Sequence, residues 1–213
     1  MNQLQPLKLL PMRERIASVL RKAILTREIQ EGTIVTLDGV ASQLEVSNTP
    51  VREAFQILAR DGFIKMRHNK GAEVLGITKK FIKDHYVTRA VLEREAVAEV
   101  CQNKVDLSEI IDAYQCGKNA IENDNYVDYT NYNQAFHMAI WAACGINKIN
   151  SILSEMWNGL SLGSNISEQE YAILSSKEHG NILNAMIEYD AELAKNLMYQ
   201  HIIRSMEDML TRF

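Results

Sequence analysis

The apolar residues near the start of the chain repeat every three or four positions, as on one face of a helix. This repeat predicts a first helix over residues 11–28, whose apolar face is formed by Ile16, Val19, Leu20, Ala23 and Ile24. Gly32 interrupts the pattern. After it, Thr36 or Asp38 can cap a short second helix.

A third helix and a hairpin are predicted next. Ser47 or Asn48 can cap the helix, and Pro50 lies in its first turn, where no N–H is needed. Gly62 ends it. The alternating segments FIKMR and AEVLGI then surround the polar residues HNKG, a hairpin pattern. The predicted elements follow the order of a winged helix-turn-helix, which is a helix, a short helix, a turn, a helix and a basic hairpin.

From Lys79 onward the sequence contains no proline and no strand pattern. The helical repeat predicts about six helices, over residues 79–102, 107–122, 125–143, 147–162, 168–188 and 190–211. Short loops between long helices are typical of antiparallel bundles. The sequence therefore predicts a mostly α fold, with a winged helix-turn-helix domain over residues 1–78 and an all-helical antiparallel bundle over residues 79–213.

Charge and composition narrow the class of protein. Residues 1–78 carry 11 basic and 8 acidic residues, whereas the remainder carries 12 basic and 19 acidic residues. Only the first part therefore favours phosphate. No segment has the run of apolar residues that a secretion signal or a membrane span needs. The spacing of Cys101, Cys116 and Cys144 fits neither a metal motif nor a disulfide framework and suggests apolar helix positions. We expect a cytoplasmic protein.

The third helix and the hairpin carry the candidate DNA-binding residues. The exposed start of the helix offers polar side chains that can reach base edges in the major groove. Arg52 suits guanine or a phosphate, and Asn48 suits an adenine edge. The full set is Ser47, Asn48, Thr49 and Arg52 in the helix, with His68, Asn69, Lys70 and Gly71 at the hairpin tip. The alternative is a solvated helix start followed by an ordinary surface turn.

Three of the five histidines fall on apolar helix faces in the second half of the chain, at positions 137, 179 and 201. Asn133 shares a face with His137, four residues later. Together they can form a site for a divalent transition metal, zinc or nickel in the first place and manganese as a further option. The alternative is that each histidine is a core residue bonded to a backbone carbonyl. His68 and His85 lie outside this pattern.

The sequence also resembles a known family. The stretch from Gly32 to Val74, which contains VSNTPVREAFQILARDGFIKMRHNKGAEV, resembles the winged helix of GntR-type regulators. The resemblance implies that Ser47, Thr49, Arg52 and the hairpin residues His68 to Gly71 contact DNA. Two residues depart from the family pattern. Asn48 replaces the usual arginine, and Asp38 stands where a basic residue or serine often contacts phosphate, so the operator sequence cannot be transferred from relatives.

The rest of the chain resembles the effector domain of the FadR-like branch of these regulators, the FCD domain. The similar segments are TRAVLEREAVAEV, YNQAFHMAIWAACGINKI and EHGNILNAMIEYDAELAKNLMYQHI. The resemblance implies a metal bound at Asn133, His137, His179 and His201, with asparagine replacing the more usual aspartate. It also implies that Arg89 binds the carboxylate of a small acid. The alternative for Arg89 is a salt bridge with Glu93.

Taken together, these features predict a ligand-responsive transcription regulator, with repression the family's usual arrangement, and not an enzyme. The expected partners are a short palindromic DNA operator, a small carboxylate effector and a second copy of the chain, with no membrane. Two alternatives remain open. One is a metal-dependent hydrolase, against which stand the lack of HExxH and of an evident carboxylate poised as general base beside the histidines. The other is a regulator whose histidines only pack, without metal or effector.

Overall fold

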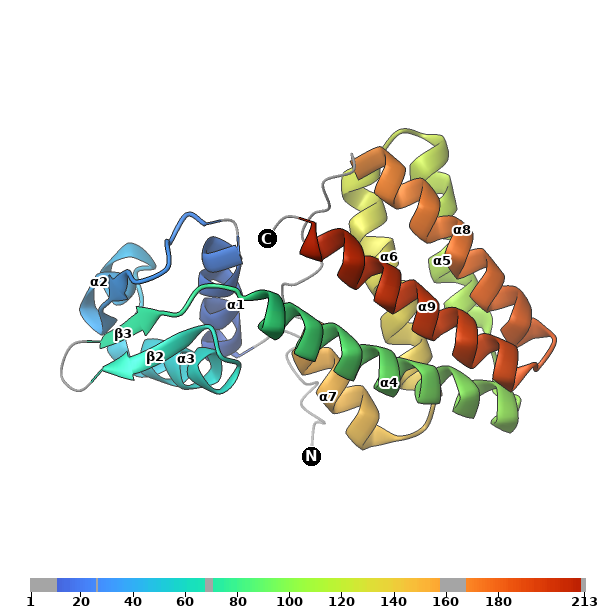
Figure 1. The fold of residues 1–213 in the computed structure, drawn as a ribbon, viewed down its shortest axis with the longest axis horizontal. Helices are drawn as coiled ribbons and strands as arrows, with labels where there is room; N and C mark the ends of the chain where they lie inside the picture. The colour runs from blue at the N-terminus through green and yellow to red at the C-terminus, as the bar shows by residue number, and fades with distance from the viewer. Residues whose placement is uncertain (1–10, 26, 68–70, 158–167, 212–213) are drawn as a thin grey trace, which may run out of the picture. The chain divides into compact units, whose positions relative to one another are not determined.

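The computed structural model describes residues 11–25, 27–67, 71–157 and 168–211. These residues form two compact units, which divide between Ile77 and Thr78. Figure 1 labels most of the helices and strands, and each unit is considered by itself.

The N-terminal unit is a winged helix-turn-helix, as predicted. Its elements are α1 (Met12–Leu25), β1 (Ile34–Val35), α2 (Leu37–Gln43), α3 (Asn48–Arg60), β2 (Ile64–Arg67) and β3 (Gly71–Val74). The strands form an antiparallel sheet in the order β1-β3-β2. Strand β1 was not predicted, because two residues are too short to show an alternating pattern. Helix α1 ends three residues before its predicted limit, and Arg27 has a φ of 60°, which is incompatible with a continuing helix.

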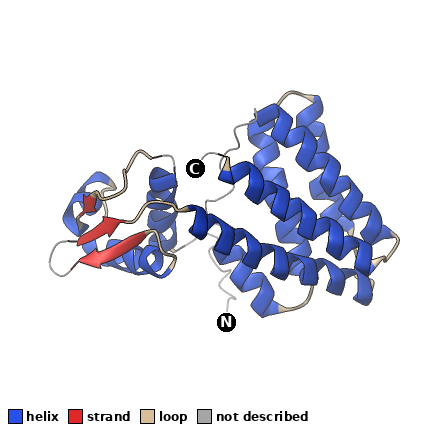
Figure 2. Cartoon of the chain, viewed as in Figure 1, coloured by secondary structure: helices blue, strands red, loops and turns tan. Residues whose placement is uncertain are grey.

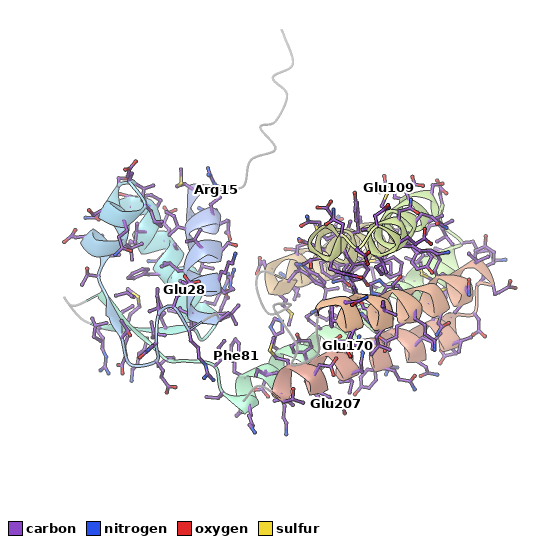
Figure 3. All side chains as sticks on the ribbon, turned by 90° about the horizontal axis from the view of Figure 1, so that it is seen from above. Arg15, Glu28, Phe81, Glu109, Glu170 and Glu207 are labelled. Atoms are coloured by element: carbon purple, nitrogen blue, oxygen red, sulfur yellow. The ribbon has the colours of Figure 1, made fainter. Side chains whose placement is uncertain are left out.

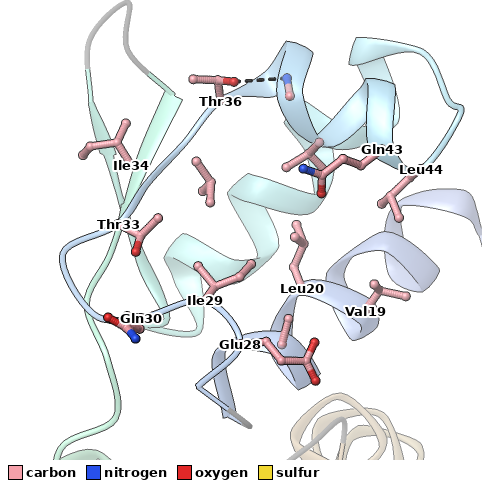
Figure 4. Close-up of a pocket in the computed structure, with 14 residues that line it drawn as sticks. Val19, Leu20, Glu28, Ile29, Gln30, Thr33, Ile34, Thr36, Gln43 and Leu44 are labelled. Atoms are coloured by element: carbon pink, nitrogen blue, oxygen red, sulfur yellow. Dashed lines mark hydrogen bonds between the residues drawn. The ribbon is translucent and has the colours of Figure 1, made fainter.

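Local hydrogen bonds and glycine positions define the helix-turn-helix. Thr36, rather than Asp38, caps α2, since its Oγ1 accepts a hydrogen bond from the backbone N–H of Gly39 at 3.1 Å. Figure 4 shows this bond at the rim of a pocket between α1, β1 and α2. Ser47 is the residue before α3, although its side chain makes no capping bond. Gly62 follows α3 with a φ of 80°, as a helix-ending glycine does.

The C-terminal unit consists, over its described residues, of helices only, and the strands in Figure 2 belong to the N-terminal unit. The helices are α4 (Lys79–Asn103), α5 (Ser108–Glu122), α6 (Tyr126–Ala143), α7 (Asn147–Trp157), α8 (Glu168–Ile187) and α9 (Ala191–Leu210). All six predicted helices are therefore present. The prediction extended α7 to residue 162, but residues 158–167 lie outside the described residues.

The helices of this unit pack around an apolar interior. Helix α4 runs along α9, α5 packs against α6, and α8 packs against α9 (Figure 1). Side-chain caps start three of them, because Thr78, Asn125 and Asp190 each accept a hydrogen bond from a backbone N–H three residues later. Charged residues such as Glu109 and Glu207 lie on the outside (Figure 3). The largest fully buried side chains include Phe136, Ile140, Trp141, Leu153, Ile182 and Met198.

The cysteines follow the prediction only in part. Cys101 and Cys144 are buried, whereas Cys116 is exposed, because it faces away from the neighbours of α5. All three are free thiols. None of the described helices is long and apolar enough to cross a lipid bilayer.

Candidate functional site

The start of α3 presents the predicted DNA-binding side chains to solvent. Ser47, Asn48, Thr49 and Arg52 are all exposed. Arg52 forms no hydrogen bond or ion pair with any described residue, so its guanidinium is available to an external partner. Asn48, by contrast, is engaged, because its Nδ2 donates to Oδ1 of Asp38 at 2.6 Å. The predicted residues His68, Asn69 and Lys70 lie outside the described residues.

Gly71 opens β3 at the other predicted DNA-binding position. Its φ is 83°, and a Cβ at this position would overlap the backbone carbonyl oxygen of Val35. The glycine is therefore required by the close approach of β3 to β1, whatever it contributes at the hairpin tip.

The three predicted histidines meet in the interior of the helical unit. His137 on α6, His179 on α8 and His201 on α9 are each at most 3% exposed. Nε2 of His201 lies 3.2 Å from Nε2 of His179 and 3.3 Å from Nε2 of His137. Among the described residues, these histidines form the one group of three or more potential metal-ligating His, Cys, Asp or Glu side chains. We refer to them as the histidine cluster.

Two buried or partly buried carboxylates bind the opposite nitrogens of these rings. Oε2 of Glu93 lies 2.6 Å from Nδ1 of His137, and Oε2 of Glu178 lies 2.6 Å from Nδ1 of His201. Burial alone would raise the pKa of Glu93, but His137 and Arg89 outweigh it and lower that pKa to about 2. The pKa of Glu178 is also lowered, because hydrogen bonds from His201 and Arg204 outweigh its burial. Both carboxylates are therefore ionised acceptors.

This arrangement determines where the ring protons lie. An ionised carboxylate can only accept, so Nδ1 of His137 and of His201 must carry the hydrogen. In the neutral ring, Nε2 is then left with an outward lone pair. Burial lowers the pKa of His201 to about 4, although Glu178 opposes this shift. Burial, together with the neighbouring His201 and His137, lowers the pKa of His179 well below its usual value.

Converging lone pairs suit a cation. Two Nε2 atoms bound about 2.1 Å from a shared metal ion, at angles of about 90–110°, lie about 3.0–3.4 Å apart. The two distances of 3.2 and 3.3 Å fall within this range. Without a cation, facing lone pairs at this separation would repel each other. His137 and His201 therefore have the geometry and the protonation of metal ligands, and His179 has the geometry of a third.

Aromatic side chains enclose the cluster. Phe136 stacks on the His179 ring, with 4.2 Å between centroids. Trp157 lies 5.1 Å from the His137 ring, centroid to centroid, and Trp141 packs against both. Trp141 also donates from Nε1 to Glu93 at 3.3 Å. Both tryptophans are thus core residues that border the cluster.

Asn133, the fourth predicted ligand, is buried on α6 one turn before His137. Its Oδ1 accepts a hydrogen bond from Oγ of Ser175 at 3.3 Å, and Ser175 lies one turn before His179 on α8. This bond uses one of the two acceptor positions of the amide oxygen, so the second is left for another donor or a cation.

Arg89, the predicted effector-binding residue, is buried and paired. Its Nε and Nη2 donate to Oε1 of Glu93 at 3.0 and 2.6 Å, and its guanidinium carbon lies 4.5 Å from the Trp157 ring centroid. The salt bridge considered as the alternative is therefore present, and it is buried rather than exposed. Nη1 makes no hydrogen bond to any described residue.

The sequence analysis missed the residues behind the histidines. The expectation was that no carboxylate is poised as a general base beside the histidines; Glu93 and Glu178, which were not predicted, contact two of the three rings through their Nδ1 atoms. Arg204 was also missed, and its Nη2 donates to Glu178 at 2.6 Å. A signal was available: Glu178 directly precedes His179, and Glu93 follows Arg89 by one turn on an apolar helix face. Neither carboxylate faces the Nε2 side of the cluster, as a hydrolase's general base would.

Comparison with known proteins gives the same assignment for both units. Residues 12–74 match the family described as bacterial regulatory proteins, gntR family, and residues 84–204 match the FCD domain. The gluconate operon transcriptional repressor of Bacillus licheniformis is 32% identical over 152 residues, covering 68% of this chain and 59% of the repressor. The chain thus spans about three fifths of that relative's length. The transcriptional repressor RspR of Escherichia coli (strain K12) is 26% identical, over 94% of this chain and 89% of RspR.

Solved structures show the same fold. The structure of McbR/YncC of E. coli has a TM-score of 0.75 and 19% identity, and covers 96% of this chain and 99% of its own. These relatives are regulators rather than hydrolases, which removes the enzyme alternative. The chain belongs to the gntR family of bacterial regulatory proteins, in the FadR-like branch that carries an FCD domain after the winged helix-turn-helix.

Proposed function

We propose that this protein is a transcriptional repressor that binds an operator through α3 and the hairpin and senses a small organic acid at a metal-containing site. The observation that carries the proposal is the presence, in one chain, of an exposed arginine at the start of α3, with no partner among the described residues, and a buried cluster of three converging histidines. The first suits a DNA groove, and the second suits a metal ion with open positions.

The proposed DNA-binding residues are Ser47, Asn48, Thr49 and Arg52, with His68, Asn69, Lys70 and Gly71 in the hairpin. Their support is the exposure of the α3 start and of Arg52, which pairs with no side chain in the part of the chain that the structure describes. We propose that the protein acts as a homodimer, which would place two such helices in successive major grooves of a short palindrome, about one helical turn apart.

The proposed metal ligands are Asn133, His137, His179 and His201, and the proposed metals are zinc, nickel or manganese. The metal would supply a positive charge and open positions for a carboxylate oxygen of the effector. Glu93 and Glu178 would hold two of the imidazoles in the ligating tautomer, as carboxylates commonly do behind metal-bound histidines. Asn133 contributes an oxygen without a negative charge, so the effector's own carboxylate would complete the charge balance.

The proposed effector is a small organic acid, with Arg89 as its second anchor. Glu93 occupies Nε and Nη2 of Arg89, and Nη1 is left to donate to a carboxylate. One relative is a gluconate operon repressor, so gluconate is the first acid to test. Binding would change operator affinity by about 5- to 150-fold if the coupling energy were in the usual range of about 1–3 kcal/mol.

Replacing Arg52 tests the DNA-binding role. Arg52→Ala should weaken operator binding by about 5- to 150-fold, because a bidentate arginine–base contact contributes about 1–3 kcal/mol. A gel-shift titration at fixed salt measures this. Arg60→Ala, at the far end of the same helix, is the matched control and should lose much less affinity. Equal losses in the two variants would show that Arg52 has no special role in binding the operator.

Elemental analysis tests the metal site. The purified protein, incubated with zinc, nickel or manganese and then desalted, should retain about one ion per chain. His179→Ala should lose that ion, because one of the three buried ligands is gone. His85→Ala, in which a half-buried histidine outside the cluster is replaced, should retain it. A wild-type protein that retains none of the three metals would favour a regulator whose histidines only pack.

The carboxylate behind His201 is tested by Glu178→Gln. The variant keeps the shape of the side chain but weakens the orienting bond, and metal affinity should fall about 10- to 100-fold. Arg204 keeps Asp208 as a partner at 2.6 Å, so the variant should still fold. Competition with a chelating dye measures the affinity. Glu95→Gln, on an exposed part of α4, should bind metal as the wild type does, and the prediction is wrong if both variants match it.

A thermal-shift screen of small carboxylates, with gluconate among them, tests the effector. An acid present at about 100 times its Kd adds about 2.7 kcal/mol of stability, which raises Tm by about 5–10 °C in a chain of this size. The shift should need the added metal. Arg89→Lys keeps a charge for Glu93 but loses the guanidinium fork, and it should lose most of the shift. A shift of the same size without metal would contradict the shared site.

A further inference from the structure

The two helices of the helix-turn-helix are joined at their starts by one side-chain hydrogen bond. Asp38 lies in the first turn of α2, and Asn48 is the first residue of α3. The distance from Nδ2 of Asn48 to Oδ1 of Asp38 is 2.6 Å, the length of a strong, charge-assisted bond. Both side chains are exposed on the surface that also presents the start of α3.

This bond fixes which way the Asn48 amide faces. A carboxylate has acceptors only, so the NH₂ group of Asn48 must face Asp38 and the carbonyl oxygen must face away. Reversing the amide would place oxygen against oxygen and lose the bond. Asp38 keeps its place in turn, because a negative charge is favourable in the first turn of a helix. The bond therefore favours this orientation before any DNA binds.

The outward groups of this pair are acceptors. They are Oδ1 of Asn48 and the lone pairs of the Asp38 carboxylate that Asn48 leaves free. In the major groove, adenine and cytosine present an exocyclic amino group, a donor, whereas guanine presents O6 and N7 and thymine presents O4, which are all acceptors. An acceptor pair matches the first two bases and opposes the last two.

We infer that Asp38 and Asn48 form one base-reading unit that accepts a hydrogen bond from an exocyclic amino group and so selects adenine or cytosine on the strand it faces. The inference rests on the proposed function, since it requires that the start of α3 enters a major groove. Arg52, one turn further along α3, supplies the positive charge that the pair lacks. Asp38, which by charge alone weakens phosphate binding, gains a role in specificity.

Selection of binding sites from a randomised double-stranded DNA pool tests the inference. For the wild type we expect one position in each half-site to be occupied by adenine or cytosine about tenfold over guanine or thymine on the same strand. Asp38→Ala frees the amide to turn, and this preference should fall to about twofold or less while the other positions keep theirs. Glu45→Gln is the matched control, because it removes an exposed negative charge from the turn between α2 and α3 and should keep the wild-type profile.

Asn48→Arg combined with Asp38→Ala supplies a second readout. Arginine donates to guanine O6 and N7, so this variant should enrich guanine at the same position. A wild type that selects guanine or thymine there overturns the inference, and so does an Asp38→Ala profile identical to that of the wild type. A wild type that enriches no sequence at all overturns the proposed DNA-reading function itself, and that outcome is distinct from the other two.

Discussion

The hydrogen bonds from two histidine Nδ1 atoms to Glu93 and Glu178 are the interactions on which the helical unit depends. Burying an imidazole without a partner costs several kcal/mol, on the order of 2–7 kcal/mol for a neutral polar group. The carboxylates remove this cost for one nitrogen of His137 and of His201. They also turn the remaining lone pairs toward a shared point. Four helices, α4, α6, α8 and α9, contribute to these contacts, so the packing of the unit and the chemistry of the cluster are set together.

Each carboxylate is itself held by an arginine. Arg89 pairs with Glu93 from α4, and Arg204 pairs with Glu178 across α9 and α8. In both cases an arginine contacts a glutamate, and the glutamate contacts a histidine of the cluster. The two sets of contacts involve different helices. Removing one partner of a buried ion pair costs about 3–5 kcal/mol, because an uncompensated charge remains. The first set is fully buried, and the second is partly exposed. We therefore expect a substitution to be tolerated better on the Glu178 side of the cluster than on the Glu93 side.

Much of this fold could be predicted from the sequence, and the reasons are local. The apolar repeat of each long helix, and capping residues such as Thr78 and Asp190, are readable along the chain, so the helices were found with their limits correct to a few residues. Strand β1 was not predicted, because its two residues can be identified as a strand only from their pairing with β3. The three histidines could be grouped, since each lies on an apolar face. Which ring each carboxylate contacts could not be predicted, because Glu93 and His137, for example, are 44 residues apart and no local pattern relates them.

The surface that carries the start of α3 follows a different rule. Its side chains are exposed, and an exposed polar contact contributes little to stability, so residues there can change without endangering the fold. Asp38 and Asn48 illustrate this freedom. In the sequence, each residue shows only the lack of the positive charge that is usual at its position. In the structure, the two side chains form a hydrogen bond with each other. We therefore expect that such an exposed pair can be exchanged at almost no structural cost, whereas Arg89 and Glu93, behind the histidine cluster, are bound to buried partners. Operator choice and effector site should consequently diverge at different rates in relatives that share this fold.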